Sequence, residues 1–145
     1  MATRNATAEW QGGLKGGSGN VAVGSGVFDG PYSYKSRFVD DEPTATNPEE
    51  LIGAAHSACY SMQLSAMLEA AGTPADSVRT TATVELRTGD EGPRIRSILL
   101  STTGRVPGID AAKFQETAQA AKGECLITHA LAGVGEITVE ASFED

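Results

Sequence analysis

Two cysteines are the side chains of this sequence best suited to chemistry. Cys59 and Cys125 lie 66 positions apart in a chain of 145 residues. A thiolate is a nucleophile and a soft metal ligand, so the pair is compatible with a redox couple, a metal site or a structural disulfide. Two cysteines are too few for the disulfide-rich scaffold of a small secreted protein, and in a cytosolic protein they indicate redox or metal chemistry.

Cys59 needs a cation from another part of the chain if it is to act as a nucleophile. It lies about twelve residues into an expected helix, roughly 18 Å from the N-terminus, beyond the reach of the helix dipole. Apolar surroundings alone would raise the pKa of the thiol and leave it inert. Arg37, near the end of a strand-like run over residues 32–39, is the best-placed cation; it alternates with Phe38, so one of the two points inward. A buried, unreactive cysteine is the alternative.

Glu49 is the carboxylate that could hold such an arginine in place. Glu49 and Glu50 open the expected helix, where negative charge complements the helix dipole. Glu50 is accounted for by a capping box, whereas Glu49 has no local duty and could bind a guanidinium through both oxygens. The alternative for Glu49 is a solvated carboxylate in the first helical turn.

The two histidines offer a competing arrangement. His56 and Cys59 are three residues apart, and Cys125 and His129 are four apart, spacings at which side chains share one face of a helix. The four would make a Cys2His2 ligand set for zinc, although neither spacing is that of a zinc knuckle. The simpler interpretation of each histidine is an ordinary imidazole, either exposed or hydrogen-bonded.

The element that must position Cys59 is an expected helix over residues 48–71. Asn47 suits its N-cap, Pro48 its first position and Gly72 its C-terminal stop. Apolar side chains surround this helix almost completely. Such a helix is expected at the centre of the molecule or of a dimer.

Strands flank this helix on both sides. They are expected over residues 6–10, 20–23, 32–39, 78–87, 94–104 and 135–143, with glycine-rich turns between the first three. A second helix begins after Asp110, buries a face that includes Phe114 and ends at Gly123, and residues 125–131 could add one or two helical turns. The order βββ-α-ββ-α-β is that of an α+β protein rather than of a doubly wound parallel sheet.

Composition and charge restrict the domain count, the partners and the location of the protein. A mass of 15.0 kDa suits one domain, residues 1–145, with a core that needs no disulfide. The net charge of −8 argues against nucleic acid or an anionic membrane surface as a partner. Because no apolar run is long enough for a membrane span or a signal peptide, a cytoplasmic location is expected.

The segment around Cys59 carries a specific resemblance. Residues 47–62, with the sequence NPEELIGAAHSACYSM, strongly resemble the OsmC branch of the OsmC/Ohr family of thiol peroxidases. Shorter segments extend the resemblance along the chain, at residues 8–10, 31–38, 106–110 and 121–125. The Ohr branch carries its arginine in the early glycine-rich loop, where this chain has Lys15; the arginine here is Arg37, as in the OsmC branch.

The resemblance implies a cysteine peroxidase that reduces organic hydroperoxides without a metal, haem or flavin cofactor. By this resemblance Cys59 matches the peroxidatic cysteine and Cys125 the resolving one, while Arg37 and Glu49 arrange the site. A sulfenic acid on Cys59 and then a Cys59–Cys125 disulfide would be intermediates. A dithiol donor, for which a lipoyl protein is one candidate, would reduce the disulfide. The alternative is a non-enzymatic module with a structural disulfide or zinc site.

The implied fold is an intertwined α+β homodimer, with antiparallel sheets around a long central helix and active sites at the subunit interface. Apolar residues expected around the site would favour a hydrophobic hydroperoxide over hydrogen peroxide. These residues are Phe38, Ile52 and Met62.

Overall fold

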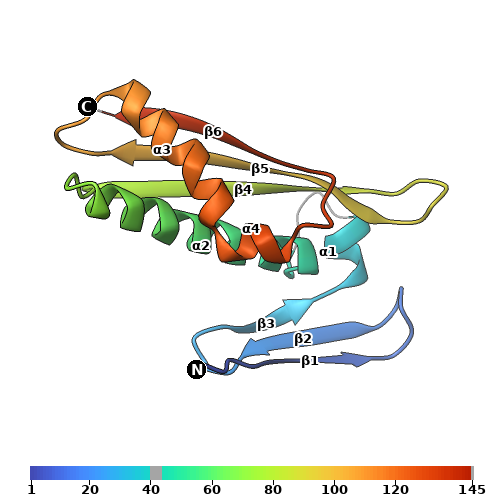
Figure 1. Cartoon of the computed structure of the whole chain (residues 1–145). Helices are drawn as coiled ribbons and strands as arrows, with labels where there is room; N and C mark the ends of the chain where they lie inside the picture. Colours follow the sequence, from blue (N-terminus) through green and yellow to red (C-terminus); the bar gives the residue numbers. More distant parts are fainter. Residues whose placement is uncertain (40–43, 145) are drawn as a thin grey trace. The chain divides into compact units, whose positions relative to one another are not determined.

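The computed structural model describes residues 1–39 and 44–144 of the chain. Two compact units make it up, Met1–Leu51 and Ile52–Asp145, and helix α2 (Pro48–Ala70) begins in the first and ends in the second (Figure 1). Each unit has a three-stranded sheet, and helices accompany both, so the predicted α+β class is confirmed. No helix within the described ranges is long and apolar enough to cross a membrane.

The first unit begins with an antiparallel meander, as predicted. Strands β1 (Ala6–Gln11), β2 (Ser18–Val23) and β3 (Asp29–Tyr32) pair in that order. The rings of Trp10 and Tyr32 lie 5.4 Å apart over Gly19, where a Cβ atom would collide with both. Glycine at this position therefore leaves room for the aromatic pair.

The segment after β3 is a helix, and the strand predicted over residues 32–39 is wrong beyond Tyr32. Helix α1 covers Tyr34–Phe38 and contains both Arg37 and Phe38, so the alternation expected of these two residues does not apply. The cause is a capping box: the Ser33 hydroxyl accepts from the Ser36 backbone N–H at 3.0 Å, and the Ser36 hydroxyl accepts from the Ser33 N–H at 3.3 Å. This local pattern outweighs the aromatic alternation that favoured a strand.

Helix α2 starts and stops where the sequence predicts. Asn47 caps it, since its side-chain oxygen accepts from the Glu50 backbone N–H at 2.9 Å. The Glu50 carboxylate accepts from the Thr46 hydroxyl at 2.9 Å instead of completing the expected capping box. Gly72, with φ of +81°, ends the helix in a Schellman motif, because the next N–H, that of Thr73, donates to the Leu68 carbonyl at 3.0 Å.

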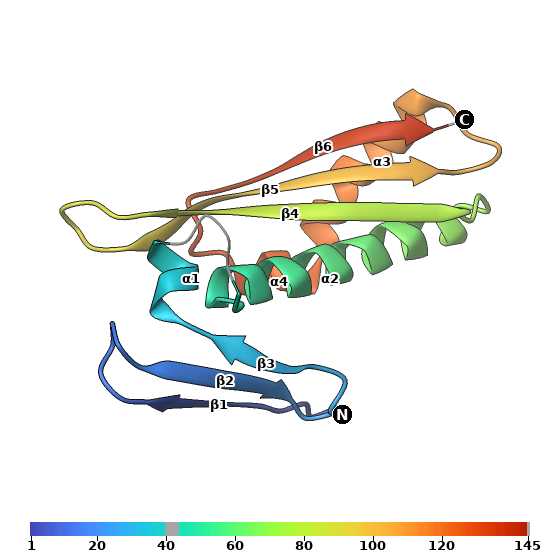
Figure 2. The same cartoon turned by 180° about the vertical axis from the view of Figure 1, so that it is seen from behind.

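The second sheet is mixed, which corrects the expectation of antiparallel sheets. Strands β4 (Ser77–Arg87) and β5 (Arg94–Arg105) form an antiparallel hairpin, whereas β5 and β6 (Glu136–Glu144) run parallel (Figure 2). The chain leaves β5 through helices α3 (Ala111–Glu124) and α4 (Leu126–Ala130) before β6. Such a helical crossover returns the next strand in the same direction.

One face of this sheet carries the core. Alternate residues of β5 are buried, and Gly104, one of them, lies against the Phe114 ring of α3. Gly53 of α2 lies against Ala82 of β4, the strand that pairs with β5. Both helices therefore cover the same face. The buried apolar residues are Tyr60, Leu64, Leu68, Ile98, Leu100, Val106, Phe114, Ala118, Ala121, Cys125 and Val139. Cys125 thus belongs to the core, at the junction of α3 and α4.

Candidate functional site

Arg37 and Glu49 form a bidentate ion pair in the first unit. Arg37 Nε donates to both Glu49 carboxylate oxygens, at 3.0 and 3.1 Å, and an Nη atom donates to Oε1 at 2.7 Å. The Glu49 side chain is 10% exposed and the Arg37 side chain 37%. The pairing expected for Glu49 is present, and the fork geometry fixes the plane of a partly exposed guanidinium.

An apolar pocket of about 190 Å³ adjoins this ion pair. Its lining residues are Trp10, Leu14, Tyr32, Ser33, Tyr34, Arg37, Phe38 and Pro48. The Phe38 ring packs 5.0 Å from Tyr34 and 5.1 Å from the Arg37 guanidinium. Phe38 was expected to bind substrate, whereas Trp10, Tyr32 and Tyr34 were not. The available signal was the position of Tyr32 and Tyr34 close to Arg37 in the sequence, whereas nothing in the sequence linked Trp10 to Arg37. The pocket can receive a small apolar group beside a cation.

Cys59 and Cys125 are in contact in the second unit. Both are free thiols, and Cys59 on α2 is partly exposed while Cys125 is fully buried. Cys59 packs against the core cluster that contains Cys125, and its side chain, acting as a donor, helps to lower the pKa of Cys125. Two residues 66 positions apart in the sequence therefore meet in the same core.

The sulfur of Cys125 sits in a polar microenvironment despite its burial. Burial alone raises the pKa of this thiol, but hydrogen bonds from the backbone and hydroxyl of Thr128, from Cys59 and from the Ile127 backbone together hold its pKa below the usual value. These contacts to sulfur are weak, and none is a strict cap bond to α4. These hydrogen bonds therefore favour the thiolate form of Cys125 more than its burial alone would allow.

His56 is fully buried one turn before Cys59 on α2. Its ring Nε2 lies 2.8 Å from Thr128 Oγ1, and Nδ1 has no hydrogen-bond partner among the described residues. Burial lowers the pKa of His56, which keeps the ring neutral at physiological pH. The sequence offered His56 only as a zinc ligand or an ordinary imidazole, and Thr128 was missed.

The four candidate zinc ligands do not assemble. Across residues 1–39 and 44–144, no three His, Cys, Asp or Glu side chains converge as a metal site requires. His129 is exposed, and its Nε2 lies 2.6 Å from the Gly123 carbonyl oxygen. Since His56 is engaged with Thr128, the Cys2His2 arrangement receives no support.

The predicted site residues fall into two groups. Arg37, Glu49 and Phe38 belong to the first unit, and the two cysteines belong to the second. Of the other predicted substrate contacts, Ile52 packs against the core of the second unit and Met62 is 75% exposed on α2. Neither lines the pocket beside Phe38.

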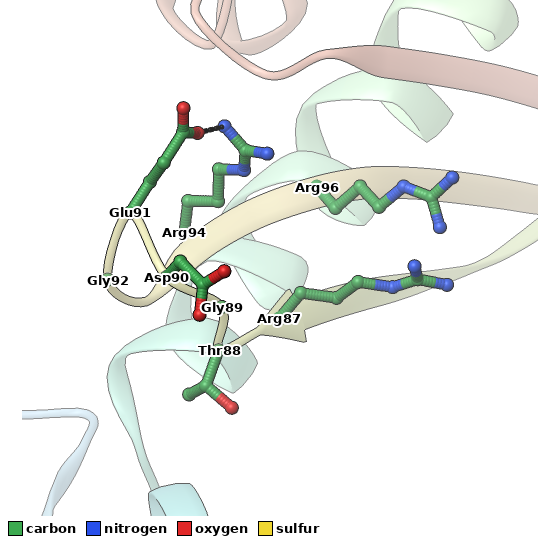
Figure 3. A pocket seen from close by; sticks show the side chains of 8 residues that line it. All are labelled: Arg87, Thr88, Gly89, Asp90, Glu91, Gly92, Arg94 and Arg96. Carbon is green, nitrogen blue, oxygen red and sulfur yellow. Dashed lines mark hydrogen bonds and ion pairs between the residues drawn. The ribbon is translucent and has the colours of Figure 1, made fainter.

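A larger cavity of about 630 Å³ lies at the turn between β4 and β5 (Figure 3). Arg87, Arg94 and Arg96 line it, together with acidic residues of the turn. Arg94 pairs with Glu91 at 2.7 Å, and all three arginine side chains are more than half exposed. The cavity has no cysteine, and exposed, paired arginines give it no fixed cation.

Comparison with known proteins places this geometry in context. The model of the family described as OsmC-like protein matches residues 40–140. The chain is 46% identical to "Peroxiredoxin OsmC" of Escherichia coli (strain K12) over 134 residues, which cover 92% of this chain and 91% of that protein. The protein of the same name from Shigella flexneri matches with the same figures.

Solved structures share the fold at lower sequence identity. An organic hydroperoxide resistance protein from Elizabethkingia anophelis has a TM-score of 0.76 at 24% identity, with 100% of this chain and 97% of that chain covered. An organic hydroperoxide resistance protein OsmC from Legionella pneumophila has a TM-score of 0.70 at 20% identity, with both chains fully covered at 100%.

Proposed function

Because this chain belongs to the OsmC-like protein family, we propose that it is a cysteine-dependent peroxidase that reduces organic hydroperoxides to alcohols. The observation that carries the proposal is the contact between an accessible thiol, Cys59, and a buried thiol, Cys125, whose pKa is lowered by hydrogen bonds that outweigh its burial. Relatives named as a peroxiredoxin and as hydroperoxide resistance proteins support the reaction class.

The first step takes place on Cys59. Its thiolate attacks the terminal oxygen of the hydroperoxide, the O–O bond breaks, and the alkoxide leaves with a proton as the alcohol. The sulfur becomes a sulfenic acid. Cys59 is assigned this role because it is partly exposed, whereas a peroxide cannot reach a fully buried Cys125 first.

The second step joins the two cysteines. The Cys125 sulfur attacks the Cys59 sulfenic acid, the S–S bond forms, the S–O bond breaks and water leaves. A dithiol then reduces the disulfide by thiol exchange. A lipoyl protein is one candidate donor, and a reducing compartment such as the cytoplasm would supply it.

Arg37 is proposed to stabilise the Cys59 thiolate and to polarise the bound peroxide. Glu49 would hold the guanidinium plane through its two oxygens. A thiolate in the middle of a helix receives no help from the helix dipole, so a side-chain cation is needed.

The pocket beside Arg37 is proposed to bind the organic group of the substrate. Its walls are largely aromatic, and the Arg37 side chain at its edge would orient the peroxide oxygens. Phe38 contributes to this wall, and Ile52 and Met62 are proposed as further apolar contacts in the assembled protein. Hydrogen peroxide would gain nothing from these surfaces, so organic hydroperoxides should react faster.

A homodimer is proposed as the working form. Ala54, Ala58, Met62 and Ala66 recur every four residues along α2, and all of them are exposed in the single chain. This exposed apolar stripe on the helix that carries Cys59 suits a second copy of α2. We propose that the active sites lie at this interface, as the resemblance to the OsmC branch implies.

A coupled peroxidase assay tests the function. Wild-type protein should consume cumene hydroperoxide faster than hydrogen peroxide, with a lipoyl dithiol and thioredoxin compared as donors. Cys59→Ser should abolish turnover because no other exposed thiol is present in the chain. Turnover by Cys59→Ser at the wild-type rate would refute the proposal. A structural disulfide instead predicts a protein that consumes no peroxide and melts at a lower temperature on reduction.

A further inference from the structure

His56 is a buried ionisable residue that the proposed peroxidase steps leave unused. Its side chain has no exposed surface, and it lies three residues before Cys59 on α2. At this spacing two side chains are neighbours on one helix face. The ring Nε2 reaches across to Thr128 Oγ1 of α4 at 2.8 Å.

Thr128 and Cys125 have a matching relationship on α4. Cys125 is the N-cap residue of this helix, and Thr128 is the third residue of its first turn. Side chains at these two positions lie next to each other at a helix start. The α4 pair, Cys125 and Thr128, therefore faces the α2 pair, Cys59 and His56, in one cluster, of which His56 and Cys125 are fully buried.

We propose that His56 is a positioning residue for disulfide formation, acting through the Thr128 hydroxyl to hold the Cys125 sulfur as a hydrogen-bond acceptor beside Cys59. In this relay Nε2 carries the ring proton and donates to Thr128 Oγ1, and the hydroxyl proton is directed at the sulfur. A neutral ring fits this role, and burial lowers the pKa of His56 accordingly.

The relay acts on a step whose atoms balance. The Cys125 thiol and the Cys59 sulfenic acid give a disulfide and one water: the sulfur lone pair of Cys125 forms the S–S bond, the S–O bond breaks, and hydroxide leaves with the proton that Cys125 gave up. The attacking species is the thiolate, which a purely apolar site would disfavour. The Thr128 hydroxyl stabilises that thiolate. The sulfenic acid depends on the proposed function, whereas the hydrogen-bond relay does not.

Other ionisable groups around the cluster do not replace this relay. Tyr60 lies on the same helix as His56; burial, and then the neighbouring Cys125, raises its pKa, and its hydroxyl donates to the Ala118 carbonyl at 2.7 Å. On α3, the Lys122 ammonium donates to the Ile137 carbonyl, and Glu124 is exposed. On α4, His129 is exposed and contacts the Gly123 carbonyl.

The experiment measures the pKa of Cys125 and the rate of disulfide formation separately. Cys125 is titrated through the ultraviolet absorbance of its thiolate, which requires no reagent to enter the core, in a Cys59→Ser background without peroxide. Disulfide formation is followed after one equivalent of cumene hydroperoxide in protein that retains both cysteines. The variants are Thr128→Val and Thr128→Ser, with Thr117→Val as the matched control, because its hydroxyl bonds only the Lys113 carbonyl within α3.

Thr128→Val should raise the pKa of Cys125 by about one to two units, the range expected for loss of a hydrogen bond to a charged group. Disulfide formation should slow roughly tenfold at neutral pH, since fewer Cys125 sulfurs are ionised, while the first reaction of Cys59 with peroxide is unchanged. Thr128→Ser and Thr117→Val should behave as wild type. An unchanged pKa and an unchanged disulfide rate in Thr128→Val would overturn the relay. A shifted pKa in a protein that never reacts with peroxide would instead overturn only the peroxidase.

The role of His56 has its own variants. His56→Leu should slow disulfide formation in the same direction as Thr128→Val, and His56→Gln, which retains a donor, should recover most of the rate. Nitrogen-15 NMR of the His56 ring in wild-type protein provides a readout that does not depend on whether a variant folds. A proton on Nε2 is expected, and a ring protonated on Nδ1 alone would contradict the relay.

Discussion

Arg37 donates three hydrogen bonds to the carboxylate of Glu49, whose side chain is only 10% exposed. On β4, Arg87 and Glu85 make an equally short contact of 2.7 Å, but their side chains are 57% and 41% exposed. An exposed ion pair contributes little stability because water screens it. When a partly buried pair loses one member, the other remains as an uncompensated charge. A comparison of the two pairs therefore tests how much burial adds to the contribution of an ion pair.

Replacement of Arg37 by lysine should slow the reaction of Cys59 with peroxide. Lysine keeps the charge but cannot form the fork that Glu49 holds, so the cation loses its fixed orientation. A fall of roughly 10²- to 10³-fold in the second-order rate constant is expected for an oriented electrostatic donor. Rapid-mixing kinetics with cumene hydroperoxide measure it. Arg87→Lys should react as wild type, and an Arg37→Lys variant within twofold of wild type would contradict the assigned role.

Replacement of Glu49 by alanine should lower the free energy of unfolding by about 1–3 kcal/mol. The guanidinium loses its charged acceptor, and Arg37 is exposed enough for water to replace part of that contact. Urea denaturation measures the change. Glu85→Ala removes a partner that water already screens and should lower the free energy of unfolding much less. Equal losses in the two variants would show that burial of Glu49 contributes nothing.

Replacement of Cys125 by serine should limit the protein to one turnover. Cys59 would still be oxidised to the sulfenic acid, but no second thiol would trap it as a disulfide. The sulfenic acid should accumulate and then proceed to sulfinic acid with excess peroxide. Dimedone labelling and intact mass spectrometry detect both species. Sustained turnover by Cys125→Ser with a dithiol donor would remove Cys125 from the cycle.

Local signals in the sequence predicted most of the fold because their causes are local. Asn47 and Gly72 bound helix α2 through hydrogen bonds within a few residues, so composition and spacing suffice to place its ends. The alternation of β5 likewise follows from one buried face. The parallel pairing of β6 depends on the path through α3 and α4, which no pattern inside the strand records.

Contacts between distant segments set the limits of prediction for the site. Glu49 stands out in the sequence because a capping box was expected to occupy its neighbour Glu50. Its bidentate contact with Arg37, however, depends on α1, a helix that the aromatic alternation concealed. The contact between His56 and Thr128 joins residues 72 positions apart. Nothing in either segment alone indicates it. Tertiary packing, not propensity, creates both arrangements.

Replacement of Met62 by lysine should dissociate the proposed dimer. Met62 is 75% exposed in the single chain and lies in the middle of the apolar stripe on α2. A charge buried between two copies would be desolvated without a partner, so the dimer dissociation constant should rise at least about tenfold. Light scattering after size exclusion should give twice the chain mass of 15.0 kDa for wild type.

Thr81→Lys is the matched control for that charge. Thr81 is exposed on the polar outer face of β4, away from the helices, so the variant should remain a dimer. A wild-type protein with the mass of one chain at micromolar concentration would contradict the dimer itself. A dimer that survives Met62→Lys would move the interface off this stripe.

Stability should depend on pH through the buried ring of His56. Burial lowers the pKa of His56 from 6.5, so the unfolded chain binds a proton on this residue at a higher pH than the folded protein does. The stability from the neutral ring is fully present above pH 6.5 and is lost as the pH falls below it. One such group contributes at most about 1.4 kcal/mol per pH unit. Glu85, whose pKa is lowered from 4.5 mainly by its hydrogen bond to Arg87, acts only at lower pH.

Urea denaturation at several pH values between about 5.5 and 7.5 isolates this effect, because the carboxylates are still ionised there. The wild-type free energy of unfolding should decrease toward pH 5.5, and His56→Gln should flatten the curve since glutamine takes up no proton. His129→Gln leaves the buried ring intact and should keep the wild-type slope. An undiminished slope in His56→Gln would mean that another group carries the pH dependence, and the neutral ring required by the Thr128 relay would lose its support.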